Sequence, residues 1–210
     1  MLIGHYAPAL VLKRVTPAVP LWVLFVSTQF LDLLWGPFIL LGIEHCRIVP
    51  HFTASNDLDL YDMPWSHSLA LAVVWSCLCG ALASGLRPSW GARGRVFAVI
   101  ALAVLSHWIA DFVVHASDLP LAPGAPRVGL GLWRSLPAAL ALETGILILG
   151  ILLTPKLPRT WMLWAFLPPV AAITFFVPTP PSPAAMALSG LATYALYAFI
   201  PYWAEKPRVH

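Results

Sequence analysis

Four ionisable residues lie in or directly after a segment apolar enough to cross a bilayer: His107, Asp111, His115 and Asp118. A charge in the hydrocarbon region costs about 2.5–3.5 kcal/mol in insertion assays, so it normally faces a partner, a cavity or a metal. Each helical residue turns by about 100°, which places these four positions within about 80° of one another. One face of this segment is therefore polar, and we expect function there.

Two further ionisable side chains lie in or beside neighbouring apolar segments. One acid lies in F-L-D-L-L-W-G-P, where Gly36-Pro37 predicts a kink, and one histidine lies in D-M-P-W-S-H-S. Imidazole and carboxylate groups without thiolates suit zinc, manganese or iron. We therefore expect a divalent metal site, with zinc first and manganese or iron as alternatives. Its four expected ligands come from three helices: Asp32, His67, His107 and Asp111.

The three cysteines do not add to this site. Cys46, Cys77 and Cys79 have the spacing of neither a disulfide framework nor a thiolate zinc site, so we expect them to pack as small apolar side chains. A buried hydrogen-bond network or a proton pathway remains an alternative interpretation of the histidines and acids.

The composition indicates an integral membrane protein. Of the 210 residues, 60% are hydrophobic and 10% charged, and the mean hydropathy is +0.81. Soluble domains carry about 25% charged residues. The net charge of +3 is small and spread along the loops, so nucleic acid is not an expected partner.

The expected fold is a single all-α domain over residues 1–210, a polytopic bundle of about six transmembrane helices. A span needs about 20 apolar residues, and the six expected spans are 18–40, 67–86, 96–116, 133–153, 160–177 and 184–203. The apolar segment over residues 1–12 is too short to cross the bilayer, so we expect it to be interfacial or re-entrant. The metal-site half covers about 1–153, and the spans over about 160–203 are expected to be scaffold.

Lysine and arginine counts predict the orientation. Nine of these residues fall on the side that holds both termini, and three fall on the other side, which puts the termini in the cytoplasm. The loop 41–66 and the polar cluster then face the extracytoplasmic side, in the inner membrane of a prokaryote. We expect the loop charges Glu44, His45, Asp57 and Asp59 to be solvated.

Short motifs follow one another along the first part of the chain: G-H-Y-A-P-A-L at 4–10, the Asp32 segment, S-H-S-L-A-L-A at 66–72 and L-S-H-W-I-A-D at 105–111. In these motifs the chain resembles the YdjM-type family of membrane-bound metal-dependent hydrolases over about residues 1–135. The residues that match family positions are His5, Asp32, His67, His107 and Asp111.

The chain also departs from the family pattern. Leu34 and Trp35 stand where P-D-x-D-H has its second aspartate and its histidine. Asp62 replaces the first histidine of H-R-G-x-T-H-S and is kept as a possible ligand, because carboxylates also bind zinc. The missing carboxylate speaks against a two-metal site. The order of ligands is also similar to that of zinc-dependent phospholipases C, which suggests phosphoester chemistry by analogy.

His5 conflicts with the charge count, which puts the N-terminus inside while Asp111 lies towards the outside. Either residues 1–12 re-enter the membrane, or the orientation is reversed, or His5 is not a ligand. Three other residues are candidates for moving protons: His115, Asp118 and Glu143.

Three functions remain open at this point. The first is a hydrolase acting on an ester or phosphoester of a lipid or lipid-linked substrate, with membrane lipid as its partner. The second is an ion- or proton-coupled transporter that uses the same polar face. The third is a non-catalytic membrane subunit braced by a metal or polar network. The oligomeric state is not predicted.

Overall fold

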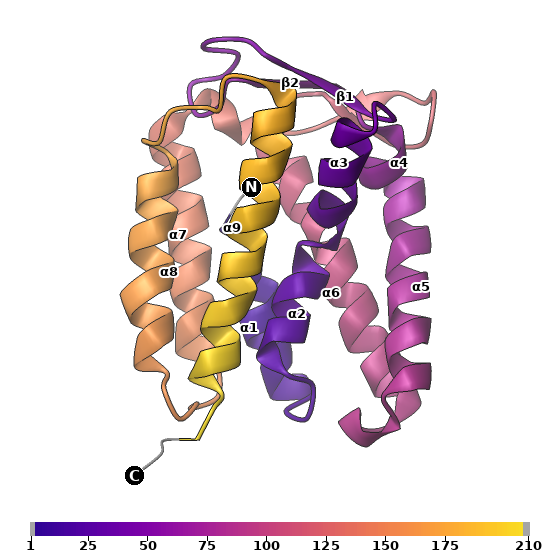
Figure 1. The fold of residues 1–210 in the computed structure, drawn as a ribbon, viewed down its shortest axis with the longest axis vertical. Coiled ribbons are helices and arrows are strands. Elements are labelled where there is room, and N and C mark those ends of the chain that lie inside the picture. The colour runs from indigo at the N-terminus through magenta and orange to yellow at the C-terminus, as the bar shows by residue number, and fades with distance from the viewer. Residues whose placement is uncertain (1–2, 208–210) are drawn as a thin grey trace.

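The computed structural model describes residues 3–207, and it is mainly helical (Figure 1). The helices are α1 (Tyr6–Val15), α2 (Leu21–Thr28), α3 (Phe30–Leu40), α4 (Pro64–His67), α5 (Leu69–Leu86), α6 (Arg93–Val114), α7 (Leu136–Leu153), α8 (Trp161–Thr174) and α9 (Pro183–Ala204), with 3₁₀ turns η1 (Pro88–Trp90) and η2 (Leu132–Arg134). Two antiparallel hairpins pair β1 (His45–Ile48) with β2 (Leu58–Asp62) and β3 (Leu119–Pro120) with β4 (Arg127–Val128).

The helices have the length and composition of membrane spans. Within the described residues, α5, α6, α7 and α9 are long and apolar enough to cross, and the bent pair α2 and α3 makes a fifth candidate. Their outward faces carry exposed leucines, among them Leu82 and Leu152, as expected of helices that contact lipid. The chain is therefore built as an integral membrane protein. A count of six is not confirmed, because α8 is shorter than a span.

The first expected span is broken, and the break lies nearer its start than expected. The axes of α2 and α3 differ by 53° across Gln29, whereas α3 continues through Gly36-Pro37. Two hydroxyls explain the position of the break. Ser27 donates to the carbonyl of Val23 and Thr28 to that of Phe25, and such back-bonding bends helices.

Helix α1 lies inside the bundle. It packs against α2, α6 and α7, and Gly150 of α7 allows this approach, since a Cβ there would lie 3.1 Å from the Cα of Ala7. Lys13, near the end of α1, donates to the carbonyls of Pro17 and Val19 and pairs with Glu205. The helix thus runs from the interior to the end of the bundle opposite the hairpins (Figure 1).

This placement of α1 bears on the conflict over His5. His5 directly precedes α1 and is buried, while the basic residues of α1 stand at its far end. His5 thus reaches Asp111 from the inner end of this short helix. The polar residues lie at the junction of two apolar clusters, one built mainly around α1, α2, α7 and α8 and the other around α3, the β1–β2 hairpin and the second half of α6.

Candidate metal centre

Four polar side chains from three helices converge on one point near the hairpin end of the bundle. The Nε2 atoms of His67 and His107 lie 3.3 Å apart. Asp32 Oδ1 is 3.3 Å from His67 Nε2 and 3.6 Å from His107 Nε2. Asp111 Oδ2 is 3.6 Å from His67 Nε2 and 3.2 Å from His107 Nε2. The expected ligands are therefore brought together by α3, α4 and α6.

Five of the six separations among these atoms match those of ligands that share one metal ion. Zinc bonds to nitrogen and oxygen of about 2.0–2.2 Å separate tetrahedral ligand atoms by about 3.3–3.6 Å. The five separations given above run from 3.2 to 3.6 Å. Three of the residues are almost fully buried, and the Asp32 side chain is 18% exposed. The donor set therefore suits zinc, and harder divalent ions such as manganese as well.

His107 is held by the break between α2 and α3. Its Nδ1 lies 2.7 Å from the carbonyl oxygen of Thr28, the last residue of α2. A carbonyl only accepts, so Nδ1 carries the hydrogen and a neutral ring directs an unprotonated Nε2 at the carboxylates. Histidines that bind metals commonly donate their other ring hydrogen in this way.

His67 is held by a relay that begins at Glu44. The Glu44 carboxylate accepts from the backbone N–H groups of Trp65 and Ser66 at 2.7 and 2.8 Å, and from the Ser66 hydroxyl at 2.6 Å. Because Ser66 donates its only hydroxyl hydrogen to Glu44, its oxygen accepts a hydrogen bond from His67 Nδ1 at 2.7 Å. The unprotonated Nε2 of a neutral His67 then faces the cluster, as that of His107 does.

The expectation that Glu44 is a solvated charge is wrong. Glu44 is 1% exposed, because it satisfies the N–H groups at the start of α4. The β1–β2 hairpin explains how it reaches them: antiparallel pairing brings the residue before β1 next to the residues after β2. Sequence reasoning had no short-range signal for this contact, which joins positions 22 residues apart.

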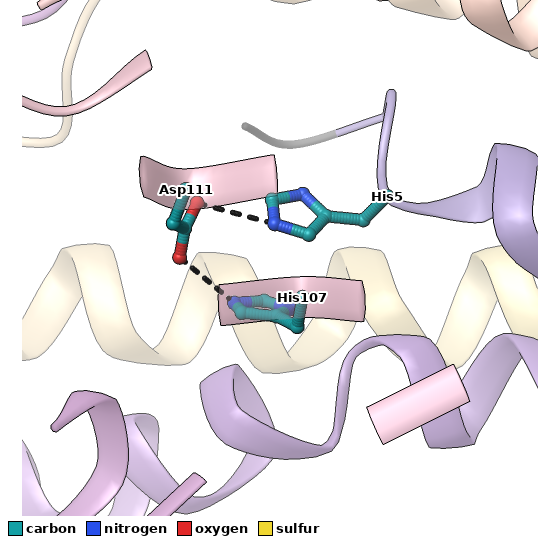
Figure 2. Close-up of side chains that lie close together, drawn as sticks. All are labelled: His5, His107 and Asp111. Atoms are coloured by element: carbon teal, nitrogen blue, oxygen red, sulfur yellow. Dashed lines mark ion pairs between the residues drawn. The ribbon is translucent and has the colours of Figure 1, made fainter. Parts of the chain in front are cut away.

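His5 and His115 lie on the other side of Asp111. His5 Nε2 is 3.1 Å from Asp111 Oδ1, the ion pair drawn in Figure 2, and its ring lies tilted by 30° over that of His107 with centroids 3.9 Å apart. His115 Nε2 is 3.6 Å from the same oxygen. Its Nδ1 lies 3.0 Å from Asp118 Oδ1, so Asp118 orients this histidine.

A cavity of about 590 Å³ adjoins the cluster. Asp32, His67, Asp111, His115 and Glu143 reach its wall, which also contains apolar and aromatic residues of α9, η2 and the segment before α9. Glu143 is 2% exposed, and its Oε2 lies 3.5 Å from the backbone nitrogen of Gly4. A buried carboxyl on the wall of this cavity is placed to exchange a proton with a bound molecule.

Helix α9 contributes to the centre and is more than scaffold. The Tyr194 hydroxyl donates to Asp32 Oδ2 at 2.6 Å, which leaves Oδ1 directed at the histidines. Gly36 permits the close contact of α3 and α9, because a Cβ there would lie 2.9 Å from Leu191 Cγ. A tyrosine in an apolar span carries no sequence signal of its own, so only the tertiary contact identifies it.

Asp62 lies outside the cluster. Its carboxylate pairs with His45 Nδ1 at 2.9 Å and is 42% exposed. Strand pairing places these two residues opposite each other in the hairpin, so the position that replaces a family histidine is turned away from the centre. Cys46 is no candidate either, because burial, and after it the nearby Asp59 carboxylate, raise the pKa of its thiol to about 11.

The loop of the β1–β2 hairpin lines part of the cavity. Asp57 accepts from the backbone N–H of His51 at 2.8 Å and from the Thr179 hydroxyl at 2.9 Å. These hydrogen bonds, the backbone one first, lower the pKa of the Asp57 carboxyl. Since they join the loop to the segment before α9, the loop is tethered on that side.

Comparisons with known proteins do not assign the chain to a family. No family model matches the chain, and neither a curated protein nor a solved structure matches it. The resemblance to YdjM-type hydrolases therefore rests on the motifs alone.

Proposed function

We propose that the protein is a membrane-embedded, metal-dependent hydrolase that acts on an ester or phosphoester of a lipid or lipid-linked substrate. The observation that carries the proposal is the convergence of two Nε2 atoms with Asp32 and Asp111, because one oxygen of each carboxylate lies 3.2–3.6 Å from both nitrogens. Zinc is the first choice of metal. A bound metal would lower the pKa of a coordinated water and polarise the bond to be cleaved.

The surroundings of the cluster support hydrolysis of a lipid. The cavity joins the buried polar centre to a wall that includes Trp133, Phe176 and Met186, which suits an acyl or isoprenoid chain. Among the described residues no lysine or arginine lines it. The negative charge of a phosphoester would therefore have to be neutralised by metal.

The membrane topology completes the proposal. We propose that α8 crosses as a sixth span, because it packs beside α7 and α9 (Figure 1). The basic loops would face the cytoplasm of a prokaryotic cell, and the hairpins and cavity the extracytoplasmic side. The motifs shared with YdjM-type hydrolases and the order of histidines and acids agree with this assignment.

The test is hydrolysis by zinc-loaded protein in mixed micelles, with a panel of phospholipids, diacylglycerols and isoprenoid phosphates. We expect turnover of one class, reduced more than about 100-fold in Glu143→Gln, because an amide cannot exchange the proton. Glu205→Gln, at the other end of the bundle, is the matched control and is expected to retain turnover. Absence of turnover on every class, with the metal bound, would contradict the proposal.

A transporter is the second candidate, and the break between α2 and α3 is the observation that favours it. Discontinuous helices frame the substrate sites of many secondary transporters, and here the break frees the Thr28 carbonyl that holds His107. Proteoliposomes with a zinc, manganese or proton gradient would show a flux lost in His107→Ala. Turnover without flux would decide for the hydrolase.

A further inference from the structure

The two oxygens of Asp111 have different neighbours. Oδ2 lies near the Nε2 atoms of His107 and His67, at 3.2 and 3.6 Å. Oδ1 lies near the Nε2 atoms of His5 and His115, at 3.1 and 3.6 Å. One carboxylate thus stands between two pairs of imidazole nitrogens, which is the arrangement of a carboxylate that bridges two metal ions.

We propose that the protein binds a second divalent cation at Asp111 Oδ1, His5 Nε2 and His115 Nε2, so that Asp111 bridges a two-metal centre. The inference rests on the proposed function, because the first cation is held by Asp32, His67, His107 and Asp111. The family motif has an aspartate where this chain has Leu34, and the loss of that carboxylate favoured a single metal ion. In this chain the second ligand pair comes instead from the segments directly before α1 and after α6.

His115 has the orientation that a ligand needs. Its Nδ1 hydrogen bonds to Asp118 Oδ1, so a neutral ring directs the lone pair of Nε2 at Asp111. The backbone holds this position: Gly131 N–H donates to the His115 carbonyl at 2.6 Å. Gly129 makes the fold possible, because a Cβ there would lie 2.0 Å from the carbonyl oxygen of Ala116. Ring contact with Trp133 completes the support, at a centroid distance of 4.4 Å.

His5 is buried in a way that a bound cation would explain. The residue is 1% exposed; its Nε2 pairs with Asp111 Oδ1, and among the described residues its Nδ1 has no hydrogen-bond partner. Burying an imidazole with one ring nitrogen unpaired is unfavourable. A cation bound to Nε2 would offset that cost. The neighbouring Gly4 is positioned by Glu143, which lines the cavity beside Asp111 and His115.

The two positions would differ in what they leave open. The first set supplies four protein atoms, so water would join its metal as a fifth ligand. The second set supplies three, Asp111 Oδ1 and the Nε2 atoms of His5 and His115, and borders the cavity through Asp111 and His115. Catalytic metals keep such an open position for water or substrate. Ions in two-metal hydrolytic sites stand about 3.5–4 Å apart and clamp both reacting oxygens. The second cation would also supply the positive charge that the cavity wall lacks.

Manganese provides a readout that does not depend on activity. Protein in detergent is stripped with a chelator, reloaded with Mn²⁺, and examined by metal analysis and electron paramagnetic resonance. We expect two ions per chain and the spectrum of an exchange-coupled pair. In His115→Ala we expect one ion per chain and an uncoupled spectrum. His45→Ala is the matched control, because that histidine is exposed in the hairpin, and it should behave as the wild type does.

A second variant covers the case in which His115→Ala fails to fold. Asp118→Asn keeps the shape of the side chain, and we expect it to weaken the second ion about 10–100-fold, as loss of a carboxylate behind a histidine does. One ion per chain in the wild type, unchanged in both variants, would overturn the second site and leave the proposed function standing. Absence of any bound ion would overturn both.

Discussion

Replacing Asp111 by asparagine is expected to reduce metal affinity more than about 100-fold and to abolish hydrolysis. Asparagine keeps the shape of the side chain but removes the charge that four imidazole groups approach within 3.1 to 3.6 Å. Removing one partner from a buried charged cluster also leaves the others uncompensated. Zinc titration with a competing chelator dye, in detergent, measures the affinity.

Asp62→Asn is the matched control for this prediction. The motif places Asp62 among the possible ligands, whereas the structure pairs it with His45 at the surface. We expect zinc affinity within about twofold of the wild type, because the side chain lies outside the cluster and exposed ion pairs contribute little. If Asp62→Asn lost zinc while Asp111→Asn kept it, the arrangement of ligands described above would be wrong.

Replacing Glu44 by glutamine is expected to weaken zinc binding about 10–100-fold without touching a ligand. Glutamine retains one acceptor oxygen but offers an NH₂ group where Ser66 now donates. The serine hydroxyl then loses its acceptor, and His67 loses its fixed orientation. The variant should also melt at a lower temperature, because a buried carboxylate that accepts three hydrogen bonds has been lost.

A control must separate loss of stability from loss of metal. Glu205→Gln removes a charge at the opposite end of the bundle, where Glu205 pairs with Lys13 and accepts from the N–H of Leu21. It should lower the melting temperature and leave zinc affinity unchanged. Equal loss of zinc in both variants would show that Glu44 acts through general stability rather than through His67.

Local sequence patterns could predict the parts of this site that lie along one helix or in one motif. His107 and Asp111 stand one turn apart, so the periodicity of α6 alone puts them on one face. Placing ionisable side chains in an apolar segment costs free energy, which predicted that other polar side chains would contact them. Asp32 and His67 lie next to them as expected. The long apolar helices followed from hydropathy in the same way.

The remaining contacts depend on how distant segments meet. Glu44 reaches Ser66 through a hairpin, and Tyr194 reaches Asp32 across 162 positions. No local sequence pattern around Glu44 or Tyr194 predicts such a distant partner. The kink was predicted at Gly36-Pro37 instead of Gln29, because proline and glycine are stronger helix-breaking signals than serine and threonine. Here the hydroxyls of Ser27 and Thr28 bend the chain.

The central claim is that Asp32, His67, His107 and Asp111 hold a divalent metal, and anomalous scattering at the zinc edge tests it most directly. Crystals of the zinc-loaded protein should show an anomalous peak about 2.0–2.2 Å from the two Nε2 atoms and from one oxygen of each carboxylate. A map with no peak among these residues, or with zinc bound only at exposed histidines of the hairpin, would contradict the claim.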